Sequence, residues 1–182
     1  MSNAHQLTGT RIILRQWRDD DAAPFAALNA DPVVMEYFPA TLSRAESDAV
    51  IERIHALFAR FGYGLWALEI PGVTPFAGMV GIAHVGFDAP FTPATEIGWR
   101  LARAYWGKGY ATEAAELALA YGFKNLQLPE IVSFTASGNL RSQAVMQRIG
   151  MTHDASDDFD HPRLAAGHRL RRHVLFRKKS DQ

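Results

Sequence analysis

The 182-residue chain contains no cysteine. This absence excludes disulfide bonds, thiolate nucleophiles and thiolate metal sites. The chain also lacks a net charge, because 19 Lys and Arg residues balance 19 Asp and Glu residues. With a pI of about 7.1, it has no overall field that would attract nucleic acid or an anionic membrane. We therefore expect neither as a partner.

Long hydrophobic runs are missing as well. No apolar stretch approaches the roughly 18 residues of a membrane span, and no signal-peptide core is visible, so we expect a cytoplasmic protein. No spacing of His, Asp and Glu resembles a metal site, and no metal is expected. The composition, 48% hydrophobic and 21% charged, suits one globular domain over residues 1–182, with residues 1–8 as a flexible terminus.

A short glycine-bearing segment, residues 106–111, runs directly into a helix rich in small residues, 112–121. Gly107 and Gly109 can adopt positive φ and let backbone N–H groups approach a ligand. The unpaired N–H groups in the first turn of the helix add partial positive charge. The segment therefore fits a phosphate or pyrophosphate, although glycines before a helix also form ordinary connections.

Hydrophobic periodicity predicts a mixed α/β chain around this segment. Three consecutive strands form an antiparallel meander before the segment, and the strand–helix–strand crossover that contains it favours a parallel pair. The segment then lies at the carboxyl end of a strand, where ligands collect in open sheets. Strands are expected at 11–17, 65–70, 79–85, 96–101, 130–135 and 173–177, and helices at 19–28, 43–61, 112–121 and 139–150, with a short helical piece from Asp31 to Tyr37.

Two helices carry clear boundary signals. Ser43 and Glu46 form a capping box, and Gly62 ends the helix that follows. Asn139 is a favourable N-cap for the later short helix, which Gly150 ends.

In this order of elements the chain resembles the GNAT superfamily of N-acetyltransferases over nearly its whole length. The superfamily's loop, Gln/Arg-x-x-Gly-x-Gly/Ala, is matched by residues 106–111 except at Trp106. The resemblance implies a GNAT-type α+β fold: a mostly antiparallel central sheet with one splayed parallel strand pair and flanking helices.

Several segments are similar to one branch, the ribosomal-protein N-terminal acetyltransferases (RimJ/RimL-like). These are Trp-Gly-Lys-Gly-Tyr-Ala-Thr-Glu-Ala at 106–114, Asn139-x-x-Ser142, Arg-Ile-Gly-Met at 148–151, and the opening segments 11–17 and 31–35.

The resemblance implies transfer of an acetyl group from acetyl-CoA to a primary amine by direct attack in a ternary complex. The acceptor is a protein or peptide N-terminus or a small-molecule amine, and the protein is a monomer or homodimer. Backbone N–H groups of residues 98–101 would stabilise the oxyanion. The implied cofactor-binding residues are Trp99, Arg100, Leu101, Trp106, Gly107, Lys108, Gly109, Tyr110, Ala111, Thr112, Asn139 and Ser142.

Three side chains are candidates for proton transfer. Glu96 and His84 are candidate bases because the amine must be neutral to attack. Alternatively, Glu96 is a solvated or cross-strand partner and His84 a hydrogen-bonded core histidine. Many relatives have a tyrosine acid where this chain has Met146, which cannot donate a proton. Ser142 would then protonate the leaving thiolate, or it merely completes the cap formed by Asn139.

Other assignments also stay open. Trp106 packs under the loop or contacts adenine, and Lys108 faces a phosphate or is solvated. The acidic residues 154–160, with His161, receive a cationic amine or form a solvated turn. The basic residues 169–179 meet RNA or protect a sheet edge. Two further function classes therefore remain: a catalytically silent acyl-CoA-binding domain and an RNA- or ribosome-associating module.

Overall fold

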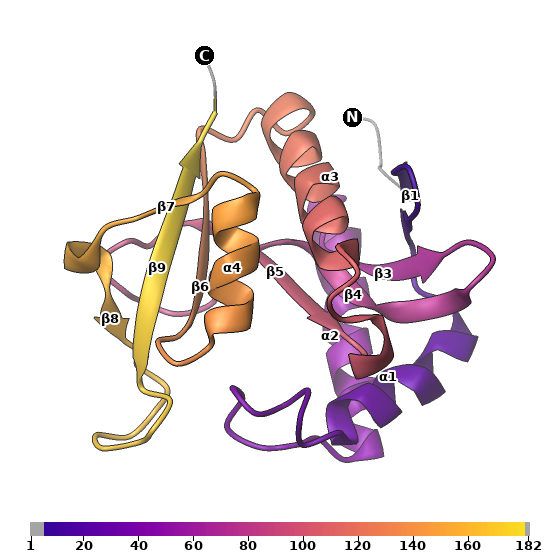
Figure 1. The fold of residues 1–182 in the computed structure, drawn as a ribbon, viewed down its shortest axis with the longest axis horizontal. Coiled ribbons are helices and arrows are strands. Elements are labelled where there is room, and N and C mark those ends of the chain that lie inside the picture. Colours follow the sequence, from indigo (N-terminus) through magenta and orange to yellow (C-terminus); the bar gives the residue numbers. More distant parts are fainter. Residues whose placement is uncertain (1–5, 181–182) are drawn as a thin grey trace.

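The computed structural model describes residues 6–180, which form one nine-stranded sheet with helices on both faces (Figure 1). The strand order is β1-β2-β3-β4-β5-β6-β9-β7, and β8 pairs with β9. The strands are β1 (Gln6–Thr8), β2 (Ile13–Arg15), β3 (Leu65–Ile70), β4 (Thr74–His84), β5 (Thr95–Leu101), β6 (Glu130–Ala136), β7 (Thr152–His153), β8 (Phe159–Asp160) and β9 (Arg172–Lys179). The helices are α1 (Ala22–Ala30), α2 (Arg44–Phe61), α3 (Tyr110–Lys124) and α4 (Leu140–Arg148), with short 3-10 turns at Asp19–Asp21, Arg103–Tyr105 and Ala155–Asp157.

Helices α3 and α4 cover one face of the sheet, and α1 and α2 cover the other (Figure 1). The small residues of α3 let it approach the sheet closely, since Ala114, Ala115 and Ala118 are completely buried. On the other face, Trp17 and Phe25 pack edge to face with ring centroids 4.9 Å apart. None of the helices within residues 6–180 combines the length and apolar character that crossing a bilayer requires.

The predicted fold class is confirmed. Strands β3, β4 and β5 form the antiparallel meander, and β5 and β6 form the one parallel pair. The capping box of α2 is present: the Ser43 N–H donates to Glu46 Oε2 at 2.7 Å, and the Glu46 N–H donates to Ser43 Oγ at 3.3 Å. Gly62 ends α2 with φ at 76°.

Three predictions near the N-terminus are wrong. The first strand is limited to Ile13–Arg15, and residues 6–8, expected to belong to a flexible terminus, form β1 and pair with β2. The rest of that expected terminus, residues 1–5, lies outside the described residues. The expected helical piece from Asp31 to Tyr37 is a series of turns instead. There Asp31 Oδ1 accepts the Val33 N–H at 2.8 Å, so the side chain stabilises a turn.

Asp21 occupies the N-cap position of α1, but its side chain does not cap the helix. Its carboxylate forms a buried ion pair with Arg15 at 2.8 Å. Arg15 also bonds Glu69 at 2.7 Å, and the hydrogen bond to Asp21 is the largest influence that raises the pKa of Arg15. This cluster ties the start of α1 to strands β2 and β3.

Candidate functional site

Strands β5 and β6 separate part-way along their length (Figure 1). Within the described residues, Glu96 and Val132 are their one register pair. Beyond it, Ser133 on β6 donates its hydroxyl to the Ile97 carbonyl at 3.0 Å. A side-chain hydrogen bond here replaces the backbone hydrogen bonds of a regular strand pair. A gap between β5 and β6 therefore widens toward the carboxyl ends of both strands.

The opening exposes backbone groups of β5. The Ala102 N–H donates to the Ala77 carbonyl at 2.9 Å, on the β4 side. Because backbone groups alternate in direction along a strand, the N–H groups of Trp99 and Leu101 face the opening. These are two of the residues assigned to the oxyanion and cofactor from the sequence.

The glycine loop follows directly. Gly107 and Gly109 have φ of 72° and 81°, as the sequence predicts. Gly109 occupies the N-cap position of α3 and has no side chain with which to cap the first turn. The N-terminal N–H groups of α3, from Tyr110 to Thr112, therefore remain available to an anion.

Arg11 holds this loop in place, a role that the sequence analysis missed. Its Nη1 donates to the Lys108 carbonyl at 3.0 Å, and its Nε pairs with Glu113 at 2.8 Å. Its guanidinium also lies 4.9 Å from the centre of the Tyr110 ring. The Lys108 ammonium donates to the Ala104 carbonyl at 3.0 Å.

Trp106 packs beneath the loop, against the buried clusters on both faces of the sheet. Its Nε1 donates to the Leu101 carbonyl at 2.8 Å, and Arg141 lies 4.5 Å from its ring centre. Trp106 therefore packs under the loop, as one of the two alternatives predicts, and it contacts both the end of β5 and α4.

Glu96, Gly98 and Arg100 share the face of β5 that lies toward α1 and α2, since alternate residues of a strand point the same way. Glu96 is partly buried, and burial raises its pKa to about 7 although the charge of Arg163 lowers it. A Cβ placed on Gly98 would meet nothing within 4 Å. There is consequently open space between Glu96 and Arg100.

Arg100 lies at the other end of this space. Its Nη1 donates to Asn29 Oδ1 at 2.6 Å, and its guanidinium lies 4.0 Å from the centre of the Phe38 ring. Its Nε is buried and has no hydrogen-bond partner, and burial lowers the pKa of Arg100 to about 10. Asn29 is itself fixed by donating to Ser47 Oγ at 2.8 Å.

His84 is not brought together with Glu96. The register partner of Glu96 is Ala83, so the next residue, His84, points to the opposite face of the sheet. There its Nε2 lies 3.0 Å from the Tyr63 hydroxyl, and its ring packs against Phe61 with centroids 4.5 Å apart. His84 is hydrogen-bonded as one alternative predicts, but it is exposed, so its assignment to the core is wrong.

Ser142 lies in the first turn of α4, on the other side of the opening. Its backbone N–H donates to Asn139 Oδ1 at 3.3 Å, which confirms the predicted cap. The Asn139 amide also donates to Thr135 Oγ1 at 2.9 Å. Met146 is buried in the main core with 1% exposure, so it only packs. Ser142 is partly buried.

The α1–α2 connection reaches across to the other half of the sheet through Glu36, which the sequence analysis also missed. The Glu36 carboxylate pairs with Arg141 at 2.9 Å, and its carbonyl accepts a bond from Arg169 at 2.7 Å. These bonds place Phe38 beside the open face of β5.

Aromatic side chains line the same face beyond Glu96. They come from the β4–β5 connection, β6, β8 and β9, and their ring centroids lie 4.6 to 6.5 Å apart in the pairs that they form. Burial lowers the pKa of both His161 and His173. The cluster consists of Phe87, Phe91, Phe134, Phe159, His161 and His173.

The acidic and basic segments near the C-terminus pair with each other. Asp157 bonds Arg177 at 2.6 Å, Asp160 bonds Arg171 at 3.2 Å, and Asp158 bonds His153 at 2.7 Å. The predicted edge role of the basic strand is wrong, because β9 pairs with β6 on one side and with β7 and β8 on the other.

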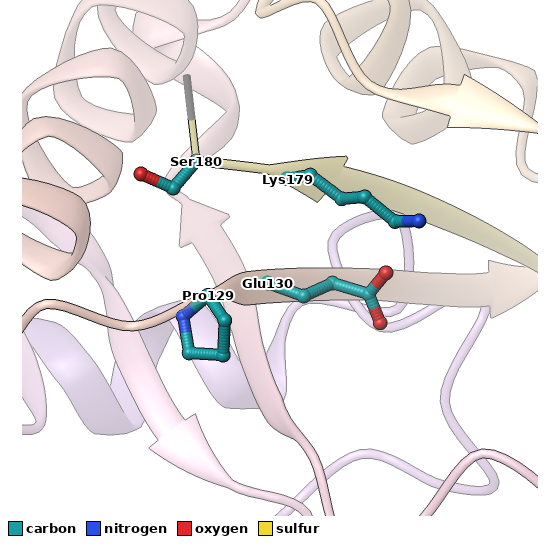
Figure 2. Close-up of a pocket in the computed structure, with 4 residues that line it drawn as sticks. All are labelled: Pro129, Glu130, Lys179 and Ser180. Carbon is teal, nitrogen blue, oxygen red and sulfur yellow. The ribbon is translucent and has the colours of Figure 1, made fainter. Parts of the chain in front are cut away.

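A shallow hollow lies where β6 begins and β9 ends (Figure 2). Its lining residues are Pro129, Glu130, Lys179 and Ser180. It is at the opposite end of β6 from Asn139 and the opening between β5 and β6, so it is separate from the candidate site.

Comparison with known proteins gives consistent results. The family model of the acetyltransferase (GNAT) domain matches residues 11–152. Two proteins of Bacillus subtilis (strain 168) are 32% identical: the uncharacterized protein YkkB, over 83% of this chain and 87% of YkkB, and the uncharacterized N-acetyltransferase YnaD, over 80% and 81%. The structure of Mycobacterium smegmatis RimJ in complex with CoA-disulfide matches with a TM-score of 0.76 at 24% identity, over 96% of this chain and 87% of RimJ.

Proposed function

Because the chain belongs to the acetyltransferase (GNAT) family, we propose that it acetylates the α-amine of a protein or peptide N-terminus, as the RimJ/RimL-like branch does, or a small-molecule amine. The family transfers acetyl groups from acetyl-CoA to amines, and the chain is an acetyl-CoA-dependent N-acetyltransferase. The proposal concerns the acceptor and the residues that act on it.

The opening between β5 and β6, which leads into the Gly109 helix start, carries this proposal. Backbone N–H groups of residues 107–112 hold the pyrophosphate of CoA. Each charge-assisted hydrogen bond of this kind contributes roughly 1.5–3 kcal/mol. Gly109 suits this role because its φ of 81° is one that L-residues with a side chain rarely adopt, and a Cβ there would lie 3.2 Å from Arg11 Nη2.

The side chains around the opening have complementary roles in the reaction. Glu96 accepts a proton from the bound ammonium, since its carboxylate is available above pH 7, and this leaves a neutral amine that can attack. The N–H groups of Trp99 and Leu101 stabilise the oxyanion that forms when the amine nitrogen attacks the carbonyl carbon. As the carbon–sulfur bond breaks, Ser142 donates its proton to the thiolate and is reprotonated by the proton that the acylated nitrogen loses.

A thiol-release assay tests the proposed function. The protein with acetyl-CoA should release free CoA thiol when N-terminal peptides or other amines are added, and mass spectrometry should find the acetylated amine. No release with any amine, despite CoA binding by calorimetry, would favour the catalytically silent alternative. Strong, salt-dependent RNA binding would favour the RNA-associating module.

Ser142→Ala is expected to lower kcat by about tenfold or more, because proton transfer by a positioned group contributes roughly 10²–10⁴-fold. The helix cap should survive, since it uses the backbone N–H of Ser142 and the side chain of Asn139. Steady-state kinetics with the best acceptor, beside CoA affinity by calorimetry, measures the effect. An unchanged kcat with intact CoA affinity would exclude Ser142 as the acid.

A further inference from the structure

Arg100 presents a cationic head group whose donors are largely unused. Among residues 6–180, Nη1 is its one atom with a hydrogen-bond partner, the neutral amide of Asn29, and its Nε is buried without one. None of the ion pairs of the described residues includes Arg100. Partly buried arginines normally pair with carboxylates, so this guanidinium lacks its usual partner.

The protein holds Arg100 in one orientation. Asn29 on α1 accepts the hydrogen bond from Nη1, and Ser47 on α2 fixes Asn29 by accepting a hydrogen bond from its amide; both residues are fully buried. Phe38, in the α1–α2 connection, stacks on the guanidinium, whose central carbon lies 4.0 Å from the centre of the ring. A fixed guanidinium with free donors is suited to a carboxylate, which accepts two parallel hydrogen bonds from it.

Glu96 lies on the same strand face, four residues before Arg100. At about 3.3 Å per residue, their Cα atoms are roughly 13 Å apart. The space over Gly98 lies between them. A negative group at one end and a positive group at the other make this face complementary to a compound with an amine at one end and a carboxylate at the other.

We propose that Arg100 binds a carboxylate of the acceptor, so that the preferred acceptors are amines that carry a carboxylate several bonds away. The amine lies toward Glu96 and the thioester, and the carboxylate lies toward Arg100. This inference rests on the proposed acetyl transfer. Arg100 is then a specificity residue, and Asn29 and Ser47 position it.

Matched acceptors test the inference. The pairs are Ala-Ala with Ala-Ala-amide, for a terminal carboxylate, and Ala-Glu-amide with Ala-Gln-amide, for a side-chain carboxylate. In a thiol-release assay, the wild type should have a kcat/KM at least about tenfold higher for the acid of one or both pairs, as one charge-assisted hydrogen bond implies. The pair that shows the larger ratio tells which kind of carboxylate is used.

Arg100→Met keeps the aliphatic part of the side chain but removes the guanidinium, so it should abolish the preference for the acid over the amide. Arg100→Lys should keep part of the preference, because the charge remains but the fork of donors is lost. Arg60→Met is the matched control, since Arg60 also lies over a phenylalanine ring, at 4.9 Å, but at the exposed end of α2. It should leave the acid-to-amide ratio unchanged.

The outcomes separate the two proposals. Equal kcat/KM for acid and amide in the wild type would overturn carboxylate binding while leaving acetyl transfer intact, and this result needs no variant to fold. A loss of CoA affinity in Arg100→Met, with the acid preference retained, would assign Arg100 to the cofactor and also overturn the inference. Failure of every acceptor would instead contradict the proposed acetyl transfer.

Discussion

Gly109→Val is expected to weaken CoA binding by roughly 10²–10⁴-fold, through two effects that add. A β-branched residue at a φ of 81° is strained, and a left-handed conformation costs about 1–2 kcal/mol. Relief of that strain moves the loop, and each lost backbone bond to the pyrophosphate removes about 1.5–3 kcal/mol. Isothermal titration calorimetry with CoA measures the effect.

Gly72→Val is the matched control for this substitution. Gly72 has φ at 75° in the β3–β4 turn, and its Cβ would meet nothing within 4 Å. The variant therefore carries the same backbone strain without touching the loop, and its CoA affinity should equal that of the wild type. Normal CoA affinity in a folded Gly109→Val protein would show that the N–H groups of this loop do not bind the pyrophosphate.

The loop can be predicted from sequence because its signals are local. The nine residues from Gly107 to Ala115 contain all of them: the glycines that allow positive φ, the start of the helix, and the small residues that let the helix approach the sheet. The same locality explains the success with the capping box of α2 and the Asn139 cap of α4.

The acceptor side of the site depends on contacts between distant residues, and periodicity does not encode them. Arg100 meets Asn29 across 71 residues, and Arg169 meets Glu36 across 133. The turn at Asp31 decides where Phe38 lies, and the predicted helical piece there would have carried it elsewhere. Alternation along β5 does place Glu96, Gly98 and Arg100 on one face, but it cannot say what covers that face.

His84 is an instructive intermediate case. Alternation of side chains along β4 puts His84 on the same face as Ile82, which packs in the α3 core. Alternation along β5 likewise predicts which residues share a face with Glu96. The register between β4 and β5 is the further information needed to show that His84 and Glu96 lie on opposite faces of the sheet. That register is a property of the connection at 85–94, which has no simple turn signal.

Glu96→Gln is expected to lower kcat/KM by roughly 10²–10⁴-fold, the usual contribution of a positioned base. In the wild type, kcat/KM should rise with pH through about 7, because the raised pKa leaves Glu96 protonated and inactive as a base below that value. In the variant, kcat/KM should no longer change with pH near 7. Its remaining pH dependence should come from the ionisation of the acceptor, whose pKa is near 8 for an α-amine. Rates of both proteins with one peptide, from pH 5.5 to about 9, measure the difference.

The same substitution should stabilise the fold at alkaline pH, which separates a loss of chemistry from a loss of structure. A carboxyl whose pKa is raised from 4.5 to about 7 on folding favours the folded state most below pH 4.5, and this contribution is lost as the pH rises through 7. Glutamine stays neutral, so the unfolding free energy of Glu96→Gln should exceed that of the wild type by up to roughly 3 kcal/mol near pH 8.5, and by little near pH 5. Glu52→Gln, on the exposed side of α2, is the control and should show neither effect. A variant that is stabilised yet fully active would mean that Glu96 is not the base, and that water takes the proton or the acceptor binds as the neutral amine.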